Sequence, residues 1–145
     1  MYKRQGKELS DNFTEAKQVF EEVNDALNFN LTKVMWEGTD KEIALTSNAQ
    51  PALMACSIAS LRVLNKITNK NLSGLASYVC GHSLGEYSAM TAAEVFSLNQ
   101  CAILLRLRGD AMQKAVPIGK GAMAALIGAN IDTAIKVIDL SLIHI

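Results

Sequence analysis

A serine at the centre of a short, glycine-flanked turn is the residue of this chain best placed to do chemistry. Residues 81–85 read GHSLG; they follow residues 76–80, which have the composition of a strand, and precede residues 86–94, which have the composition of a helix. A sharp strand-to-helix turn lifts a serine hydroxyl clear of a sheet and requires small flanking residues, an arrangement known as a nucleophile elbow. The pattern therefore predicts that Ser83 is a nucleophile.

A nucleophilic serine also needs a base and a donor that stabilises an oxyanion. Of the two histidines, His82 adjoins the serine and points away from it at a sharp turn, whereas His144 is more simply interpreted as a residue of the tail. The backbone amide of Leu84 begins the following helix, so we predict that it is one oxyanion donor, helped by the helix dipole. The sequence offers no recognisable second donor.

Arg108 is the second side chain with a specific chemical use. It lies in the middle of a predicted helix, next to Gly109 and two residues after Arg106, so the two arginines should face different sides. A guanidinium can hold a carboxylate through two parallel hydrogen bonds, although a solvated arginine is the simpler interpretation. A glycine inside a helix usually has a packing reason, and close approach to the turn at Ser83 is one candidate.

The pattern of apolar residues predicts an α/β domain with a parallel sheet covered by helices. We expect Ser10 or Asp11 to cap the first helix, Pro51 to lie in the first turn of a buried helix, and Ser97 with Gln100 to form a capping box. The predicted helices span residues 11–27, 51–67, 86–94, 97–116 and 131–140, with short helical turns at 31–45, and the predicted strands span 76–80 and 121–127.

Composition excludes several classes of protein. Half of the 145 residues are hydrophobic, and 14 Lys and Arg balance 14 Asp and Glu, so nothing suggests binding to nucleic acid or a membrane surface. No apolar run approaches the ~20 residues of a membrane span. Cys56, Cys80 and Cys101 lie in apolar surroundings and are expected to be reduced core residues, not disulfides or metal ligands. We therefore expect a cytoplasmic protein.

Several motifs together resemble malonyl-CoA:acyl carrier protein transacylases. Residues 81–89 are similar to the active-site segment of that family, and residues 50–53, QPAL, are similar to its Gln-Pro-Ala helix start. The resemblance runs from about residue 6 to residue 137 in the same order and spacing, and it includes Arg108-Gly109, Met112-Gln113, residues 115–117 and residues 121–125.

The resemblance implies a role for each site residue. Ser83 would attack the malonyl thioester, the Leu84 amide would stabilise the oxyanion, Arg108 would bind the malonyl carboxylate, and His82 would line the pocket. The malonyl group would then pass to the phosphopantetheine thiol of acyl carrier protein, with malonyl-CoA as substrate and neither a tightly bound cofactor nor a metal. The implied fold is an α/β-hydrolase-like core over residues 1–120, followed at 121–145 by the start of a ferredoxin-like subdomain.

The chain also departs from this family. It has no counterpart of the family's first apolar strand or of the Gly-Gln-Gly-Ser-Gln loop that supplies the second oxyanion donor, and the family's general-base histidine would lie beyond residue 145. With only two predicted strands, we expect a chain truncated at both ends relative to the family. Two alternatives therefore stay open: an inactive remnant of such an enzyme, and an esterase-type α/β hydrolase in which His144 would be the base.

Overall fold

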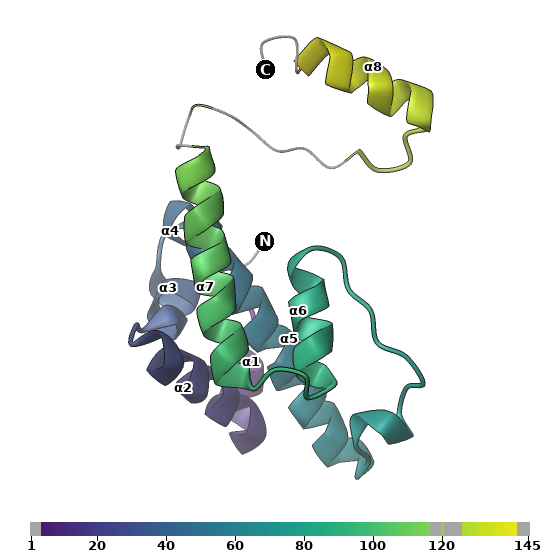
Figure 1. The fold of residues 1–145 in the computed structure, drawn as a ribbon. Helices are drawn as coiled ribbons and strands as arrows, with labels where there is room; N and C mark the ends of the chain where they lie inside the picture. Colours follow the sequence, from purple (N-terminus) through teal and green to yellow (C-terminus); the bar gives the residue numbers. More distant parts are fainter. Residues whose placement is uncertain (1–3, 117–119, 121–125, 142–145) are drawn as a thin grey trace. The chain divides into compact units, whose positions relative to one another are not determined.

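The computed structural model describes residues 4–116, 120 and 126–141 (Figure 1), and the chain divides into two compact units. The first unit ends at Ala115, and the second begins at Val116. The first contains α1 (Lys7–Asn12), α2 (Thr14–Leu27), α3 (Leu31–Glu37), α4 (Asp40–Ala44), α5 (Thr46–Thr68), the 3₁₀ turn η1 (Leu72–Gly74), α6 (Leu84–Ala92) and α7 (Leu98–Ala115). The second contains α8 (Ile131–Ser141), close to the helix predicted for residues 131–140.

Helix α5 is the centre of the first unit. It packs against α7, α2 and α6, and α7 also contacts α2 (Figure 1). The buried core between these helices is apolar, as the spacing of hydrophobic residues predicts. Its largest side chains include Phe20 and Val23 of α2, Met54 of α5 and Leu105 of α7.

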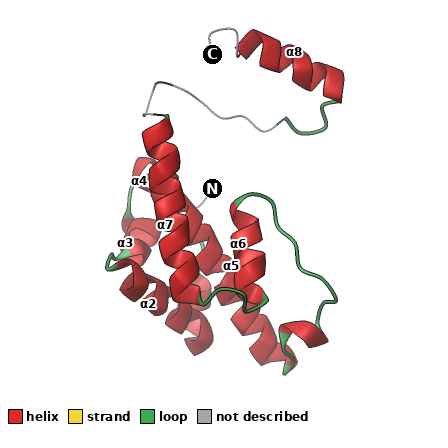
Figure 2. Ribbon diagram, in the orientation of Figure 1, coloured by secondary structure: helices red, strands yellow, loops and turns green. Residues whose placement is uncertain are grey.

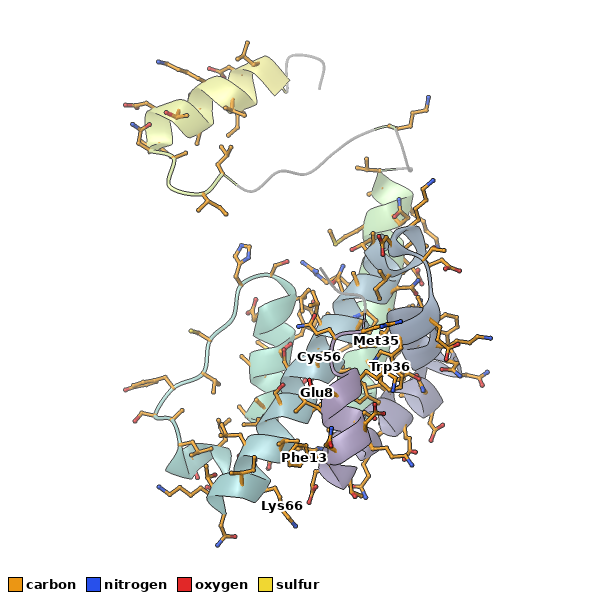
Figure 3. All side chains as sticks on the ribbon, turned by 180° about the vertical axis from the view of Figure 1, so that it is seen from behind. Glu8, Phe13, Met35, Trp36, Cys56 and Lys66 are labelled. Atoms are coloured by element: carbon orange, nitrogen blue, oxygen red, sulfur yellow. The ribbon has the colours of Figure 1, made fainter. Side chains whose placement is uncertain are left out.

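The chain before α2 folds back onto this core. Trp36 Nε1 and Cys56 Sγ both donate hydrogen bonds to the Gln5 carbonyl, at 3.3 and 3.6 Å, and both residues are labelled in Figure 3. The prediction that Ser10 or Asp11 caps the first long helix is wrong, because both lie inside α1. The break falls instead at Phe13, whose extended backbone separates α1 from α2.

Helix α5 begins earlier than predicted. Pro51 lies five residues after the first residue of α5 rather than in its first turn. Its missing amide proton leaves no donor for the Ser47 carbonyl. Upstream contacts hold the helix start nevertheless: the Leu45 carbonyl accepts from the Asn48 and Ala49 amides, both at 2.8 Å. The predicted helix end is confirmed, since Asn69 adopts the left-handed conformation at the C-cap.

The capping box that begins α7 is also confirmed. The Ser97 amide donates to Gln100 Oε1 at 3.0 Å, and the Gln100 amide donates to Ser97 Oγ at 3.2 Å. This reciprocal pair satisfies donors that the first turn of a helix otherwise leaves free.

The strand predicted at residues 76–80 is not formed. These residues are irregular and exposed, and Figure 2 shows only helices and loops in the part of the chain that is described. A strand needs a neighbour to pair its backbone amides and carbonyls, and no described segment offers one. Residues 121–125 of the other predicted strand lie outside the described residues, as do Pro117 and His144.

The cysteines differ from one another. Cys56 and Cys101 are buried, as predicted, whereas Cys80 is exposed, so its assignment to the core is wrong. The reason is that Cys80 belongs to the irregular segment that packs against no sheet. None of the described helices has the length and hydrophobicity needed to cross a membrane.

Candidate active site

Ser83 lies in a strained turn immediately before α6. Its backbone has φ 56° and ψ −116°, a combination that side-chain-bearing residues rarely adopt. The turn is closed by the Gly85 amide, which donates to the His82 carbonyl at 2.9 Å, and by the Glu86 amide, which donates to the Ser83 carbonyl at 3.2 Å. This is the geometry expected of a nucleophile elbow, although the strand that usually precedes it is absent from the described residues.

Gly81 makes the tight turn possible. A β-carbon at this position would lie 2.0 Å from the carbonyl carbon and oxygen of Gly85, so any larger residue must displace the backbone. Gly85 itself faces open space, since a β-carbon there would meet no described atom within 4 Å. The two flanking glycines of the motif therefore differ in the space around them: among the described atoms, packing requires a glycine at position 81 but not at position 85.

Arg108 reaches the serine hydroxyl. It lies on α7, 25 residues after Ser83, and its Nη2 donates a hydrogen bond to Ser83 Oγ at 3.0 Å. The guanidinium carbon is also 5.7 Å from the centre of the Tyr87 ring on α6, within the range of a cation–π contact. The structure thus brings together two of the predicted site residues, the Ser83 hydroxyl and the Arg108 guanidinium.

The other two predicted site residues lie beside this pair. The Leu84 amide is the first of α6, so it has no acceptor within its own helix and is available at the positive end of the helix dipole. The His82 side chain is exposed and makes no hydrogen bond with any described residue. The structure therefore shows no link between the His82 ring and Ser83.

The packing reason for Gly109 differs from the one considered from the sequence. A β-carbon at Gly109 would lie 2.5 Å from Ser47 Cα and 2.8 Å from the Thr46 carbonyl oxygen. The glycine therefore permits close approach of α7 to the start of α5, not to the elbow. This crossing places Arg108 within reach of both α5 and Ser83.

Two arginine–amide pairs lie at this crossing. Arg106 Nη1 donates to Asn48 Oδ1 at 2.8 Å, and Arg108 Nη1 donates to Gln50 Oε1. Successive helix positions differ by about 100°, so the two arginines leave α7 on opposite sides of Leu105 and Gly109, as expected. Only Arg108 contacts Ser83; Arg106 lies over the Phe29 ring at 4.7 Å. Burial lowers the pKa of Arg106, and the Asp110 carboxylate opposes that change.

Sequence reasoning did not assign a role to Gln50 or Tyr87. Gln50 is 58 residues from Arg108 in the chain, and no local pattern predicts their contact. The signal that could have found it is a polar side chain inside an otherwise apolar helix, where burial requires a hydrogen-bond partner. No group of three or more described His, Cys, Asp or Glu residues is arranged to hold a metal ion.

A serine in a strained turn before a helix is the arrangement of the nucleophile in enzymes that form acyl-serine intermediates, and in this chain a guanidinium also lies at the hydroxyl. Comparison with known proteins agrees with this class, because residues 6–142 match the acyl transferase domain. The chain belongs to the acyl transferase domain family.

Individual relatives are more specific. The chain is 41% identical over 134 residues to a malonyl CoA-acyl carrier protein transacylase of Bacillus subtilis, covering 92% of this chain and 41% of that protein. Among solved structures, it is similar to an acyl-carrier-protein-S-malonyltransferase from Bartonella henselae, with a TM-score of 0.86 and 47% identity over 95% of this chain and 44% of that one.

A third similarity concerns a complex. The structure of a type II PKS acyl-carrier protein with its malonyl-transacylase matches with a TM-score of 0.79 and 36% identity, over 94% of this chain and 44% of the matched chain. The solved relatives are acyltransferases with an α/β fold, whereas the described part of this chain is helical. The chain spans 41% of the length of the Bacillus subtilis relative.

Proposed function

We propose that this chain carries the acyl-serine site of a malonyl transferase that moves malonyl from CoA to the phosphopantetheine thiol of acyl carrier protein, a step of fatty acid synthesis. The observation that supports this most is the hydrogen bond of 3.0 Å from Arg108 Nη2 to Ser83 Oγ. A cation at the nucleophile suits an acyl group that ends in a carboxylate.

In the first half-reaction, Ser83 Oγ attacks the thioester carbonyl carbon of malonyl-CoA. The carbonyl oxygen becomes negative and lies against the Leu84 amide at the start of α6, where the helix dipole favours negative charge. The C–S bond then breaks, CoA leaves as the thiolate, and it takes up the proton lost from Ser83. In the second half-reaction the phosphopantetheine thiol loses its proton and its sulfur attacks the ester carbonyl carbon. The C–O bond to Ser83 then breaks, and the serine oxygen takes up the proton that the thiol lost.

Arg108 selects the acyl group. As Ser83 Oγ bonds to the acyl carbon it becomes an ester oxygen, and Arg108 Nη2 turns from it to the malonyl carboxylate, so that this contact stabilises the transition state of acylation. An acetyl group has no carboxylate and gains nothing from this cation. His82, exposed beside the turn, would line the entrance for the acyl chain.

An ester hydrolase is the less suitable alternative. Both enzymes need a base at the serine, so the base does not distinguish them. The distinguishing group is the described side-chain partner of Ser83, the Arg108 guanidinium, which can hold a carboxylate. This contact favours an anionic acyl group over general ester hydrolysis.

The remaining parts of the proposal concern architecture and setting. We assign residues 1–120 to an α/β-hydrolase-like core and 121–145, which include α8, to the start of a ferredoxin-like subdomain. The substrates are malonyl-CoA and acyl carrier protein, without a tightly bound cofactor, in the cytoplasm.

Labelling of Ser83 tests the proposal. Incubation with malonyl-CoA should add one malonyl group to the peptide that contains Ser83, measured by mass spectrometry, and Ser83→Ala should remove the signal. Arg108→Ala should slow labelling by malonyl-CoA about 100-fold and labelling by acetyl-CoA far less, because it removes a charged hydrogen-bond donor. Absence of any label at high malonyl-CoA would indicate an inactive remnant. If the wild-type chain hydrolyses a nitrophenyl ester but is not labelled by malonyl-CoA, and Ser83→Ala abolishes the hydrolysis, the chain would be an esterase.

A further inference from the structure

We infer that Gln50 is the positioning residue that holds the Arg108 guanidinium at Ser83 and so sets the preference for a carboxylate-bearing acyl group. The inference rests on the proposed function and adds a residue to which the resemblance assigns no role. Gln50 opens the QPA segment, and its side chain is buried with only 4% of the residue exposed.

Both ends of the Gln50 amide are occupied. Oε1 accepts from Arg108 Nη1, while Nε2 donates to Thr46 Oγ1 at 2.7 Å and to Met112 Sδ at 3.4 Å. A thioether sulfur accepts hydrogen bonds and does not donate them, so the NH₂ end must face Met112. The oxygen end is thereby left facing Arg108, and the orientation of the amide follows from its neighbours.

This arrangement holds one terminal nitrogen of the guanidinium, Nη1, and leaves the other, Nη2, available at Ser83. With Nη1 bound to Gln50, Nη2 is directed at Ser83 Oγ at 3.0 Å, and the Tyr87 ring lies beside the cation. An arginine side chain loses rotamer entropy when it is held in one geometry, so a partner that restrains it before substrate arrives strengthens carboxylate binding. Gln50 reaches the substrate only through Arg108, which makes it a positioning residue.

The neighbouring pair provides a matched control. Asn48 lies two residues earlier on α5, is 7% exposed, and accepts from Arg106 Nη1 at 2.8 Å. Arg106 makes no contact with Ser83; it contacts Asn48 and the Phe29 ring and interacts electrostatically with Asp110. Loss of the Asn48 amide therefore removes a buried arginine–amide bond from the same helix crossing without touching the site.

The test compares Ser83 labelling by malonyl-CoA and by acetyl-CoA in the full chain. Gln50→Met keeps the side-chain length but loses the acceptor, so the ratio of malonyl to acetyl labelling should fall about 10-fold, the loss of one hydrogen bond to a charged group. Asn48→Leu should leave the ratio within about twofold while lowering stability, as a purely structural change does. Thr46→Val, a milder change that loosens the far end of the Gln50 amide, should give an intermediate ratio.

Two results overturn the inference while leaving the proposed function standing. One is a wild-type chain that prefers malonyl and keeps this preference in Gln50→Met. The other is an equal fall of the ratio in Gln50→Met and Asn48→Leu. By contrast, if neither malonyl-CoA nor acetyl-CoA labels the wild-type chain, the result counts against the proposed function itself.

If neither thioester labels the wild-type chain, a double-mutant cycle tests whether Gln50 and Arg108 interact. The free energies of unfolding of Gln50→Met, Arg108→Met and the double variant are compared in urea. If Gln50 holds Arg108, the double variant loses less stability than the sum of the two single variants. Strict additivity would show that the two side chains do not act together and would overturn the inference.

Discussion

On the N-terminal side of Ser83, residues 75–82 are exposed and irregular, whereas on its C-terminal side α6 and α7 pack against α5. The first region contributes the turn itself, through Gly81. The second contributes the groups that surround the hydroxyl: the Leu84 amide, Tyr87 and Arg108. The difference teaches that the helical packing behind Ser83 suffices to bring its hydroxyl and the Arg108 guanidinium together, even where the preceding segment has no partner strand among the described residues.

The largest expected effect comes from Gly81, one of the two glycines that flank Ser83, and the other, Gly85, is its control. Gly81→Val forces a side chain into the Gly85 backbone and should slow Ser83 labelling by malonyl-CoA about 100-fold, because a nucleophile displaced by about 1 Å loses that much rate. Gly85→Ala meets open space and should label at nearly the wild-type rate. Equal losses in the two variants would mean that the flanking positions do not differ as the structure indicates.

The second prediction compares an apolar residue from each region. Leu105→Ala in α7 removes a fully buried side chain and should lower the free energy of unfolding by about 2–5 kcal/mol. Tyr78→Ala removes a side chain that is 93% exposed and should change stability by less than about 0.5 kcal/mol. Urea unfolding followed by circular dichroism measures both. A cost at Tyr78 comparable with that at Leu105 would show that the segment before Ser83 is packed in solution.

A third prediction concerns the crossing of α5 and α7. Gly109→Ala places a β-carbon 2.5 Å from Ser47 Cα and should destabilise the chain by about 1–3 kcal/mol, despite alanine's better helix propensity. Gly74→Ala is the control, because a β-carbon there would meet its nearest atom at 3.5 Å. A stabilised Gly109→Ala variant in the same unfolding experiment would contradict the close approach of the two helices.

The smallest expected effect is a dependence of the free energy of unfolding on pH that arises from Cys56, a buried residue of α5. Burial raises the pKa of the Cys56 thiol to about 12, whereas an unfolded thiol titrates near its ordinary value of 9.0. Unfolding therefore releases a proton above pH 9, and stability should fall by roughly 1 kcal/mol per pH unit from this group as the pH rises toward 12.

Comparison of variants isolates this contribution from that of other groups. Cys56→Ala should show a shallower loss of unfolding free energy between pH 8 and pH 10 than the wild-type chain, a difference of about 1 kcal/mol. Cys80→Ala, in the exposed segment, should keep the wild-type slope. An identical slope in all three chains would show that Cys56 is not buried when the chain is folded.

The sequence predicted those parts of the fold whose cause is local. Phe20 and Val23 follow the helical period and are buried, and the capping box of Ser97 and Gln100 begins α7 as expected. Pro51 misled the prediction because its preference for a first turn is weak compared with the contacts that hold residues 46–50 in α5. The strand at 76–80 could not be settled from composition, since pairing depends on segments elsewhere in space.

The candidate site divides in the same way. Ser83 and the Leu84 amide follow from a contiguous motif, and Arg108 is marked by its adjacency to Gly109. The contact of Arg108 with Gln50 spans 58 residues and depends on how two helices cross, which no spacing along the chain encodes. The roles of Ser83, Leu84, Arg108 and His82 stay predictions that the labelling experiments test.

The absence of a side chain at Gly109 has a consequence that reaches beyond stability. Gly109 follows Arg108 directly, and the backbone that it touches, Thr46 and Ser47, lies one turn before Gln50. The distance between α5 and α7 at this crossing therefore determines how closely the Arg108 guanidinium can approach the Gln50 amide. A single methyl group at Gly109 would therefore separate Arg108 from Gln50 and weaken the proposed preference for malonyl over acetyl groups.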